Sequence, residues 1–128
     1  MRKVMVFGVF DGVHGGHRAF LKEAKSHGDY LIVVLAQDHI VERLKGHLPQ
    51  INLAERLAHL KNEDGVDEVV IGDSELGAWE VILKHQPQVV AVGHDQQLLK
   101  ESLEKHCVDK SLSFCPALKV MAYYEYNN

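Results

Sequence analysis

The stretch Gly8-Val9-Phe10-Asp11-Gly12-Val13-His14-Gly15-Gly16-His17 decides the fold of this chain. An apolar run, residues 4–7, leads into it, and a helix-forming run, residues 18–25, follows it. Its four glycines let the backbone approach a ligand closely. A helix that starts here presents unpaired N–H groups and the positive end of its dipole, and the two histidines can donate further hydrogen bonds. The stretch therefore predicts a strand-to-helix turn that binds a nucleoside triphosphate.

Short apolar runs alternate with amphipathic stretches along the chain, which is the pattern of an α/β protein with a parallel sheet. The first run is apolar on both faces, as expected when helices cover both sides of the sheet. Strands are expected at residues 3–8, 30–36, 68–71, 88–92 and 119–123. Helices are expected at residues 17–27, 39–44, 52–62, 77–85 and 96–106. Polar segments then gather at the carboxyl ends of the strands, where open α/β sheets bind ligands.

The spacing Gly-x-Phe-Asp-x-x-His-x-Gly-His in residues 8–17 resembles the signature of the cytidylyltransferase-like nucleotidyltransferases. That family includes glycerol-3-phosphate and phosphocholine cytidylyltransferases, archaeal-type FAD synthases and phosphopantetheine adenylyltransferase. The resemblance extends over roughly residues 3–110 and includes Lys45, Arg56 and the segment Gly93-His94-Asp95. It implies a single-domain, Rossmann-like fold of the HIGH-superfamily type, a three-layer sandwich with a mainly parallel five-stranded sheet.

The resemblance also implies roles for the matched residues. His14, His17 and Lys45 are the predicted catalytic residues, with the histidines on the α and β phosphates and the lysine on the triphosphate or the acceptor's phosphate. Arg56 is predicted to bind the acceptor or to orient Asp11. The predicted nucleotide-binding residues are Gly8, Val9, Phe10, Asp11, Gly16, Gly93 and Asp95. Mg²⁺ or another divalent cation is expected to bridge the phosphates, with no metal ligands assigned to the protein.

Each of these residues also has an ordinary structural interpretation. The two histidines could be structural or could bind a transition metal, although no third ligand is suitably spaced. Asp11 could form a turn or cap a helix, and Lys45 could be a solvated loop residue. Arg56 could lie on a helix surface, and Asp95 could cap the helix that follows it.

Composition narrows the class of protein. A chain of 128 residues with 46% apolar and 25% charged residues is expected to form one soluble domain over residues 1–128. The longest apolar run, residues 31–36, is too short to cross a bilayer, and the net charge of −4 argues against a nucleic-acid partner. No charged-then-apolar leader precedes the first strand, so a cytoplasmic location is expected. Cys107 and Cys115 lack a Cys-x-x-Cys spacing and are expected to be reduced thiols.

More than one function remains open. The family normally carries a second signature of the Ser/Thr-x-x-Arg type after the last strand, and this sequence ends at Asn128 without one. The first hypothesis is a nucleotidyltransferase that moves a nucleoside monophosphate from CTP or ATP to a phosphate-bearing small molecule, either a glycerol-3-phosphate-like alcohol phosphate or FMN, with release of pyrophosphate. The alternative is a non-catalytic nucleotide-binding domain. A metal-dependent nucleotide hydrolase is a third hypothesis, which the lack of a carboxylate cluster disfavours. The family resemblance implies a homodimer.

Overall fold

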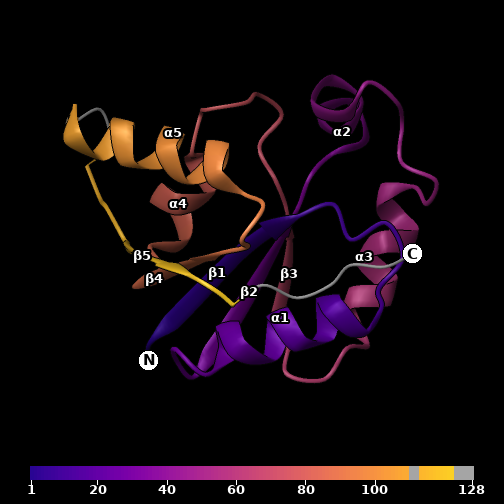
Figure 1. Ribbon diagram of the computed structural model, residues 1–128, viewed down its shortest axis with the longest axis horizontal. Helices are drawn as coiled ribbons and strands as arrows, with labels where there is room; N and C mark the ends of the chain where they lie inside the picture. The colour runs from indigo at the N-terminus through magenta and orange to yellow at the C-terminus, as the bar shows by residue number, and fades with distance from the viewer. Residues whose placement is uncertain (110–112, 123–128) are drawn as a thin grey trace.

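A single five-stranded sheet with helices on both faces forms the centre of the computed structural model, which describes residues 1–109 and 113–122 (Figure 1). Its strands are β1 (Lys3–Gly8), β2 (Tyr30–Leu35), β3 (Glu68–Ile71), β4 (Val89–Val92) and β5 (Ala117–Val120). Neighbouring strands are parallel, in the order β3-β2-β1-β4-β5. The predicted α/β, Rossmann-like class is confirmed.

The helices build the two outer layers. They are α1 (Gly15–Lys25), α2 (Asp38–Lys45), α3 (Leu53–Lys61), α4 (Glu80–His85) and α5 (Gln97–Val108). Apolar side chains of α1 and α3 pack on one face of the sheet, and those of α4 and α5 pack on the other. Both faces of β1, β2 and β4 are therefore covered, which explains why these strands are almost entirely apolar. Among the described residues, no helix is long and apolar enough to cross a membrane.

The sheet opens between β1 and β4. β1 pairs with β2 along its whole length. With β4, by contrast, the described residues pair only at Val4↔Val89 and Met5↔Val90. The strand order also reverses here. β2 and β3 follow one another on one side of β1, whereas β4 and β5 lie on its other side. The carboxyl ends of β1 and β4 thus form the switch point at which such sheets bind ligands.

Two helices, α1 and α4, begin two or more residues away from the positions expected from the sequence. α1 begins two residues earlier, because His14 is its N-cap and accepts the N–H of Gly16 on its Nδ1 atom at 3.2 Å. α4 begins at Glu80 rather than at residue 77. Gly77 and Trp79 have φ angles of 79° and 56°, in the left-handed region that a right-handed helix excludes. The first residue of each of these two helices is therefore set by capping and backbone angles, which the apolar periodicity of the sequence does not indicate.

The cysteines correct another expectation. Cys107 and Cys115 form a disulfide, with their Cα atoms 5.9 Å apart. The prediction of two reduced thiols is wrong, because the sequence does not show that these two cysteines, eight positions apart, lie close enough to bond. β5 also starts earlier than expected, at Ala117, and the expected end of this strand at residue 123 lies outside the described residues.

Candidate active site

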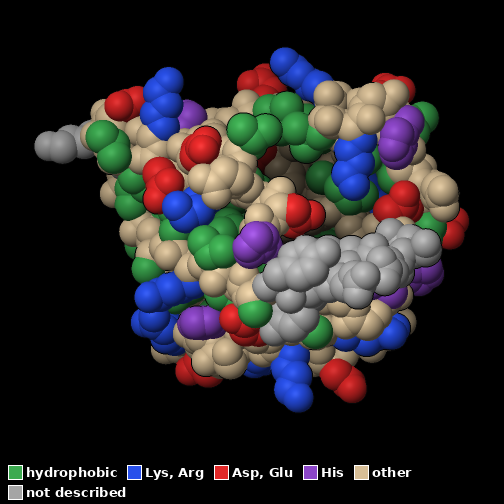
Figure 2. Space-filling view, in the orientation of Figure 1, with side chains coloured by type: hydrophobic (Ala, Val, Ile, Leu, Met, Phe, Trp, Pro, Cys, Tyr) green, Lys and Arg blue, Asp and Glu red, His purple; other side chains and the backbone are tan. Residues whose placement is uncertain are grey.

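A cleft of about 680 Å³ lies at the carboxyl ends of the strands. Its walls come from the turn after β1, from α2, from the segment between β3 and α4, and from the start of α5. Figure 2 shows a hollow in this face of the molecule, with a Lys or Arg side chain and hydrophobic side chains beside it. Most of the predicted site residues line the cleft, namely Gly8, Val9, Phe10, Asp11, His14, His17, Lys45, Gly93 and Asp95. Gly16 and Arg56 are not part of its lining.

The turn after β1 brings the two histidines together. The ring of Phe10, a residue with a φ of 51°, lies against Gly8, where a Cβ atom would be only 2.6 Å from the ring. Gly12 then donates its N–H to the carbonyl of Phe10 at 2.9 Å, and the chain enters α1. The rings of His14 and His17 stack with their centroids 3.9 Å apart, and the Phe10 ring lies 5.1 Å from that of His17. The glycine-rich sequence therefore holds both imidazoles at the start of a helix.

The environment of His17 disfavours its charged form. Burial and the neighbouring His14 lower the pKa of the His17 imidazole to about 4. A hydrogen bond to the backbone of Gly12 and the charge of Asp95 raise this pKa, and Lys45 lowers it, but burial dominates. His17 is therefore neutral at neutral pH, and a neutral imidazole still donates one N–H. A bound polyphosphate would add negative charge nearby and raise this pKa.

Lys45 adds a positive charge at the edge of the cleft. It is the last residue of α2, its side chain is exposed, and Gly46, with a φ of 82°, ends the helix after it. The ammonium group, the imidazole pair and the N-terminus of α1 give this part of the cleft several donors for anionic oxygens. We call this part, lined by His14, His17 and Lys45, the phosphate end.

Asp11 holds a loop in place. Its carboxylate oxygens accept the N–H groups of Gln50 and Ile51, each at 2.8 Å, and so fasten the loop after α2 to the turn after β1. This geometry favours the turn-forming interpretation for the carboxylate, although the residue also lines the cleft. A direct contact between Asp11 and a nucleotide stays a prediction.

Arg56 is buried and holds the ends of two strands together. Its side chain is 0% exposed, and its Nη2 pairs with Oδ1 of Asp38 at 2.6 Å. Its guanidinium donates at 2.8–2.9 Å to three backbone carbonyls, those of Val9, Ala36 and Ile51. The buried guanidinium is taken up by the ends of β1 and β2 and by the loop, which favours a structural role. A contact between Arg56 and the acceptor stays a prediction, and the carboxylate that Arg56 binds is that of Asp38 rather than that of Asp11.

Gln96 joins β1 to β4 where the two strands separate. Its side-chain amide donates to the carbonyl of Phe7 at 2.8 Å and accepts the N–H of Gly93 at 2.7 Å. The bridge fixes the floor of the cleft between the two strand ends. Asp95 is exposed and does not cap the next helix, because α5 has Gln96 as its N-cap residue. The sequence analysis missed Gln96, since a glutamine after a strand gives no sign of which backbone groups it binds.

Much of the remaining lining of the cleft is apolar, although Asp73, Glu75, Asp95, Gln96 and Ser102 also line it, and these apolar residues were not predicted from the sequence. Leu44, Leu76 and Leu98 line it although they are 61%, 45% and 83% exposed, and Leu99 and Trp79 lie among the same lining residues. Exposed leucines from α2, α5 and the segment before α4 thus converge on one cavity. Such convergence favours a ligand with a sizeable apolar surface. We call this part the apolar end.

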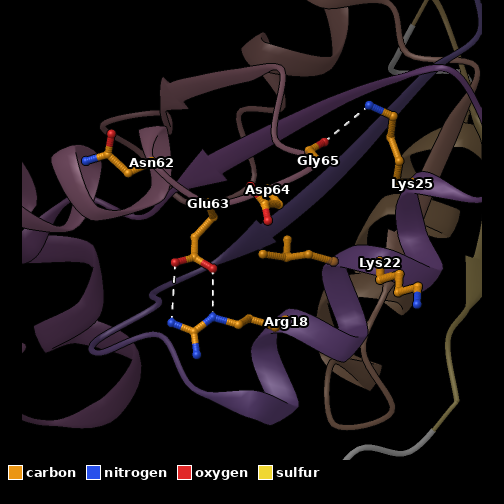
Figure 3. A pocket seen from close by; sticks show the side chains of 8 residues that line it. Arg18, Lys22, Lys25, Asn62, Glu63, Asp64 and Gly65 are labelled. Carbon is orange, nitrogen blue, oxygen red and sulfur yellow. Dashed lines mark hydrogen bonds and ion pairs between the residues drawn. The ribbon is translucent and has the colours of Figure 1, made fainter.

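A second hollow, of about 580 Å³, lies between α1 and the segment after α3 (Figure 3). Arg18 forms an ion pair with Glu63 at 2.8 Å, and Lys25 donates to the carbonyl of Gly65 at 3.3 Å. Both cationic side chains therefore already interact with groups of the protein. None of the predicted site residues lines this hollow. The cleft remains the candidate active site.

Comparison with known proteins gives concordant matches. A family model described as cytidylyltransferase-like matches residues 5–116, a range that contains every predicted site residue. The FAD synthase of Thermococcus sibiricus is 40% identical over 118 residues, which is 89% of this chain and 80% of that protein. The FAD synthase of Pyrococcus abyssi is 47% identical over 106 residues, or 79% of this chain and 71% of that protein. A crystal structure described as the lipopolysaccharide core biosynthesis protein from Thermoplasma volcanium has a TM-score of 0.86 at 30% identity and covers 98% of this chain and 99% of its own.

Proposed function

Because the chain belongs to the cytidylyltransferase-like family of nucleotidyltransferases, we propose that it transfers AMP from ATP to the phosphate of FMN and releases pyrophosphate. The FAD synthases among its relatives support this choice of substrates. The observation that carries the proposal is the lining of the cleft, which combines donors for phosphates with leucines and Trp79. FMN and ATP each combine a phosphate with a flat ring, which is the chemistry that such a cleft accommodates.

The apolar end favours FMN over a glycerol-phosphate-like acceptor. An alcohol phosphate is polar throughout, so burying it against Leu76 and Leu98 would cost hydration without a compensating hydrogen bond. An isoalloxazine ring instead gains from leaving water and contacting leucine and aromatic side chains. The composition of the wall therefore supports a flavin.

The proposed reaction needs little covalent chemistry from the protein. A phosphate oxygen of FMN attacks the α-phosphorus of ATP, the bond from that phosphorus to the oxygen bridging to the β-phosphorus breaks, and pyrophosphate leaves with the electron pair. The attacking phosphate is already ionised at neutral pH, so no base has to remove a proton. His14, His17 and Lys45 would hold the phosphates in line and offset the charge on the leaving group.

A divalent cation would enter with the nucleotide. Among the residues that the structure describes, no group of three or more His, Cys, Asp or Glu side chains is arranged to hold a metal ion. The phosphates themselves would therefore supply most of the ligands of Mg²⁺, which commonly keeps waters and binds phosphate oxygens. A homodimer, implied by the family, stays a prediction that sedimentation velocity can test.

The proposal is tested by combining each of four nucleotides with each of two acceptors. ATP, CTP, GTP and UTP are each incubated with FMN or glycerol 3-phosphate in the presence of Mg²⁺, and both pyrophosphate and the joined product are measured. We expect FAD and pyrophosphate from ATP with FMN, and a large loss of both in the His17→Ala variant but not in His59→Ala, which changes an exposed histidine on α3. Turnover of CTP with glycerol 3-phosphate instead would overturn the choice of substrates. Saturable nucleotide binding without pyrophosphate from any pair would favour the non-catalytic alternative.

A further inference from the structure

Trp79 carries a buried hydrogen-bond donor that the fold does not use. It is the only tryptophan in the chain, it lines the cleft, and it is 7% exposed. Within the described part of the chain, its buried Nε1 atom has no hydrogen-bond partner. Buried indole N–H groups usually find an acceptor, because an unpaired one loses its hydration without replacement.

The position of this indole is well fixed. Trp79 stands immediately before α4 with a φ of 56°, and its ring meets that of Phe7 edge-on with the centroids 5.7 Å apart. The His106 ring packs against it in a similar way, with a centroid distance of 6.4 Å. The indole is thus held between the sheet and α5, which places its N–H reproducibly.

Nearby polar side chains of the cleft are, by contrast, used by the fold. The Asp73 carboxylate accepts the N–H of Glu80 at 2.9 Å. The Gln96 amide spans the ends of β1 and β4 through Phe7 and Gly93. Among the described residues, the indole N–H is a buried donor in this cleft that has no partner in the fold, and a ligand with a ring acceptor would supply one.

We propose that Trp79 is a specificity-determining residue whose N–H donates a hydrogen bond to a ring nitrogen or ring carbonyl of a flat heteroaromatic group bound at the apolar end. The inference rests on the proposed function, in which both substrates carry such a ring: the flavin of FMN and the adenine of ATP. The cleft that Trp79 lines is also lined by Leu76 and Leu98, whose exposed side chains would offer apolar contacts to such a ring. An aliphatic alcohol phosphate has no ring acceptor and leaves the N–H unpaired.

A single tryptophan makes the test direct, because a ¹H–¹⁵N spectrum of the protein contains one indole signal. The protein is titrated separately with riboflavin, FMN, ATP and glycerol 3-phosphate. We expect a saturable downfield shift of the indole proton with at least one ring ligand. A shift with riboflavin and FMN identifies the flavin as the bound ring, and a shift with ATP identifies adenine. Glycerol 3-phosphate, which can engage only the phosphate end, should leave the signal in place. An indole signal that stays fixed while a ring ligand saturates the protein overturns the inference.

Substitution gives a second measurement. Replacing Trp79 by 3-benzothienylalanine keeps the shape of the ring system and removes the N–H, and should weaken binding of the ring ligand about five- to tenfold. Trp79→Phe should weaken it at least as much, while Leu83→Ala, on the exposed side of α4, should leave it unchanged. Unaltered affinity in the benzothienyl protein would contradict the inference.

The inference and the proposed function can fail separately. If the protein forms FAD and the indole signal does not respond to any substrate, the role of Trp79 is wrong and the function stands. If riboflavin or ATP shifts the indole signal but no FAD forms, the role of Trp79 stands and the function is wrong. If no ring ligand binds, both are wrong.

Discussion

Replacing Arg56 with methionine separates a role in the protein frame from a role in acceptor binding. Methionine keeps a long, flexible side chain but removes the guanidinium, so Asp38 and the carbonyls of Val9, Ala36 and Ile51 lose their donor. Breaking a buried ion pair by removing one partner costs about 3–5 kcal/mol. The Asp38 side chain is 37% exposed, so water can replace the lost ion pair and reduce its contribution to the loss of stability. The three backbone carbonyls that lose their donor add to that loss. We therefore expect a loss of about 3–5 kcal/mol from a typical total of about 5–15 kcal/mol.

Urea unfolding measures this loss. With a slope of about 1–3 kcal/mol per molar urea, the unfolding midpoint of Arg56→Met should fall by about 2 M. Arg18→Met is the matched control, because Arg18 also pairs with a carboxylate, that of Glu63, but its side chain is 59% exposed. An exposed ion pair contributes little to stability because water and salt screen it, so the control midpoint should move little.

The kinetic result decides between the two roles. If Arg56 held the acceptor, Arg56→Met would keep a midpoint close to that of Arg18→Met and would raise the KM for FMN alone. That pattern would refute a structural role for Arg56. A lowered midpoint, with the KM for ATP and for FMN both affected, supports a guanidinium that holds the strand ends together.

The other predictions concern the phosphate end. His17→Ala should lower turnover by about 10²-fold or more while keeping a cooperative thermal transition, because the imidazole offsets charge in the transition state. The folded-state pKa of His17 is lowered from 6.5 to about 4, so the unfolded chain binds more protons between these pH values. Stability should thus be flat above pH 6.5 and fall by about 1–2 kcal/mol, after allowance for solvent screening, as the pH drops from 6.5 to 4. The difference in urea midpoint between wild type and His17→Ala should track this fall; a pH-independent difference would contradict it. Asp11→Ala should release the loop at Gln50 and Ile51 and raise the KM for ATP about tenfold, roughly the effect of losing one charged hydrogen bond, and an unchanged KM in steady-state kinetics would show that the loop is held by other contacts.

The sequence was informative where the backbone alone decides the structure. β1, β2 and β4 are buried on both faces, so their apolar runs mark them as strands of a covered parallel sheet. The turn after β1 was equally predictable, because Gly8 and Gly12 permit a close ring contact and a positive φ that other residues resist. Strand burial and the geometry of a glycine-rich turn depend on residues that are close in the sequence, so both could be predicted from it.

Contacts between distant segments could not be predicted in this way. Arg56 bonds to the carbonyl of Val9, 47 positions earlier, and no periodicity or motif indicates a partner of that kind. Trp79 lies in the core, and whether its N–H finds a partner among the described residues depends on what α5 and Phe7 place around it. The disulfide between Cys107 and Cys115 likewise depends on the path of the chain rather than on a motif.

Asp11 and Arg56 act on the same loop from opposite sides. Asp11 accepts the N–H of Ile51, and Arg56 binds the carbonyl of the same residue, so both backbone groups of Ile51 are fixed by charged side chains. Lys45 lies at the other end of this loop and lines the cleft, so we expect its position to shift when Ile51 is released. A residue can thus be needed for nucleotide binding without touching the nucleotide. A match to the family signature therefore does not distinguish the two kinds of residue. Their contacts in the structure are needed to separate residues available to the substrate from residues that hold the loop in position.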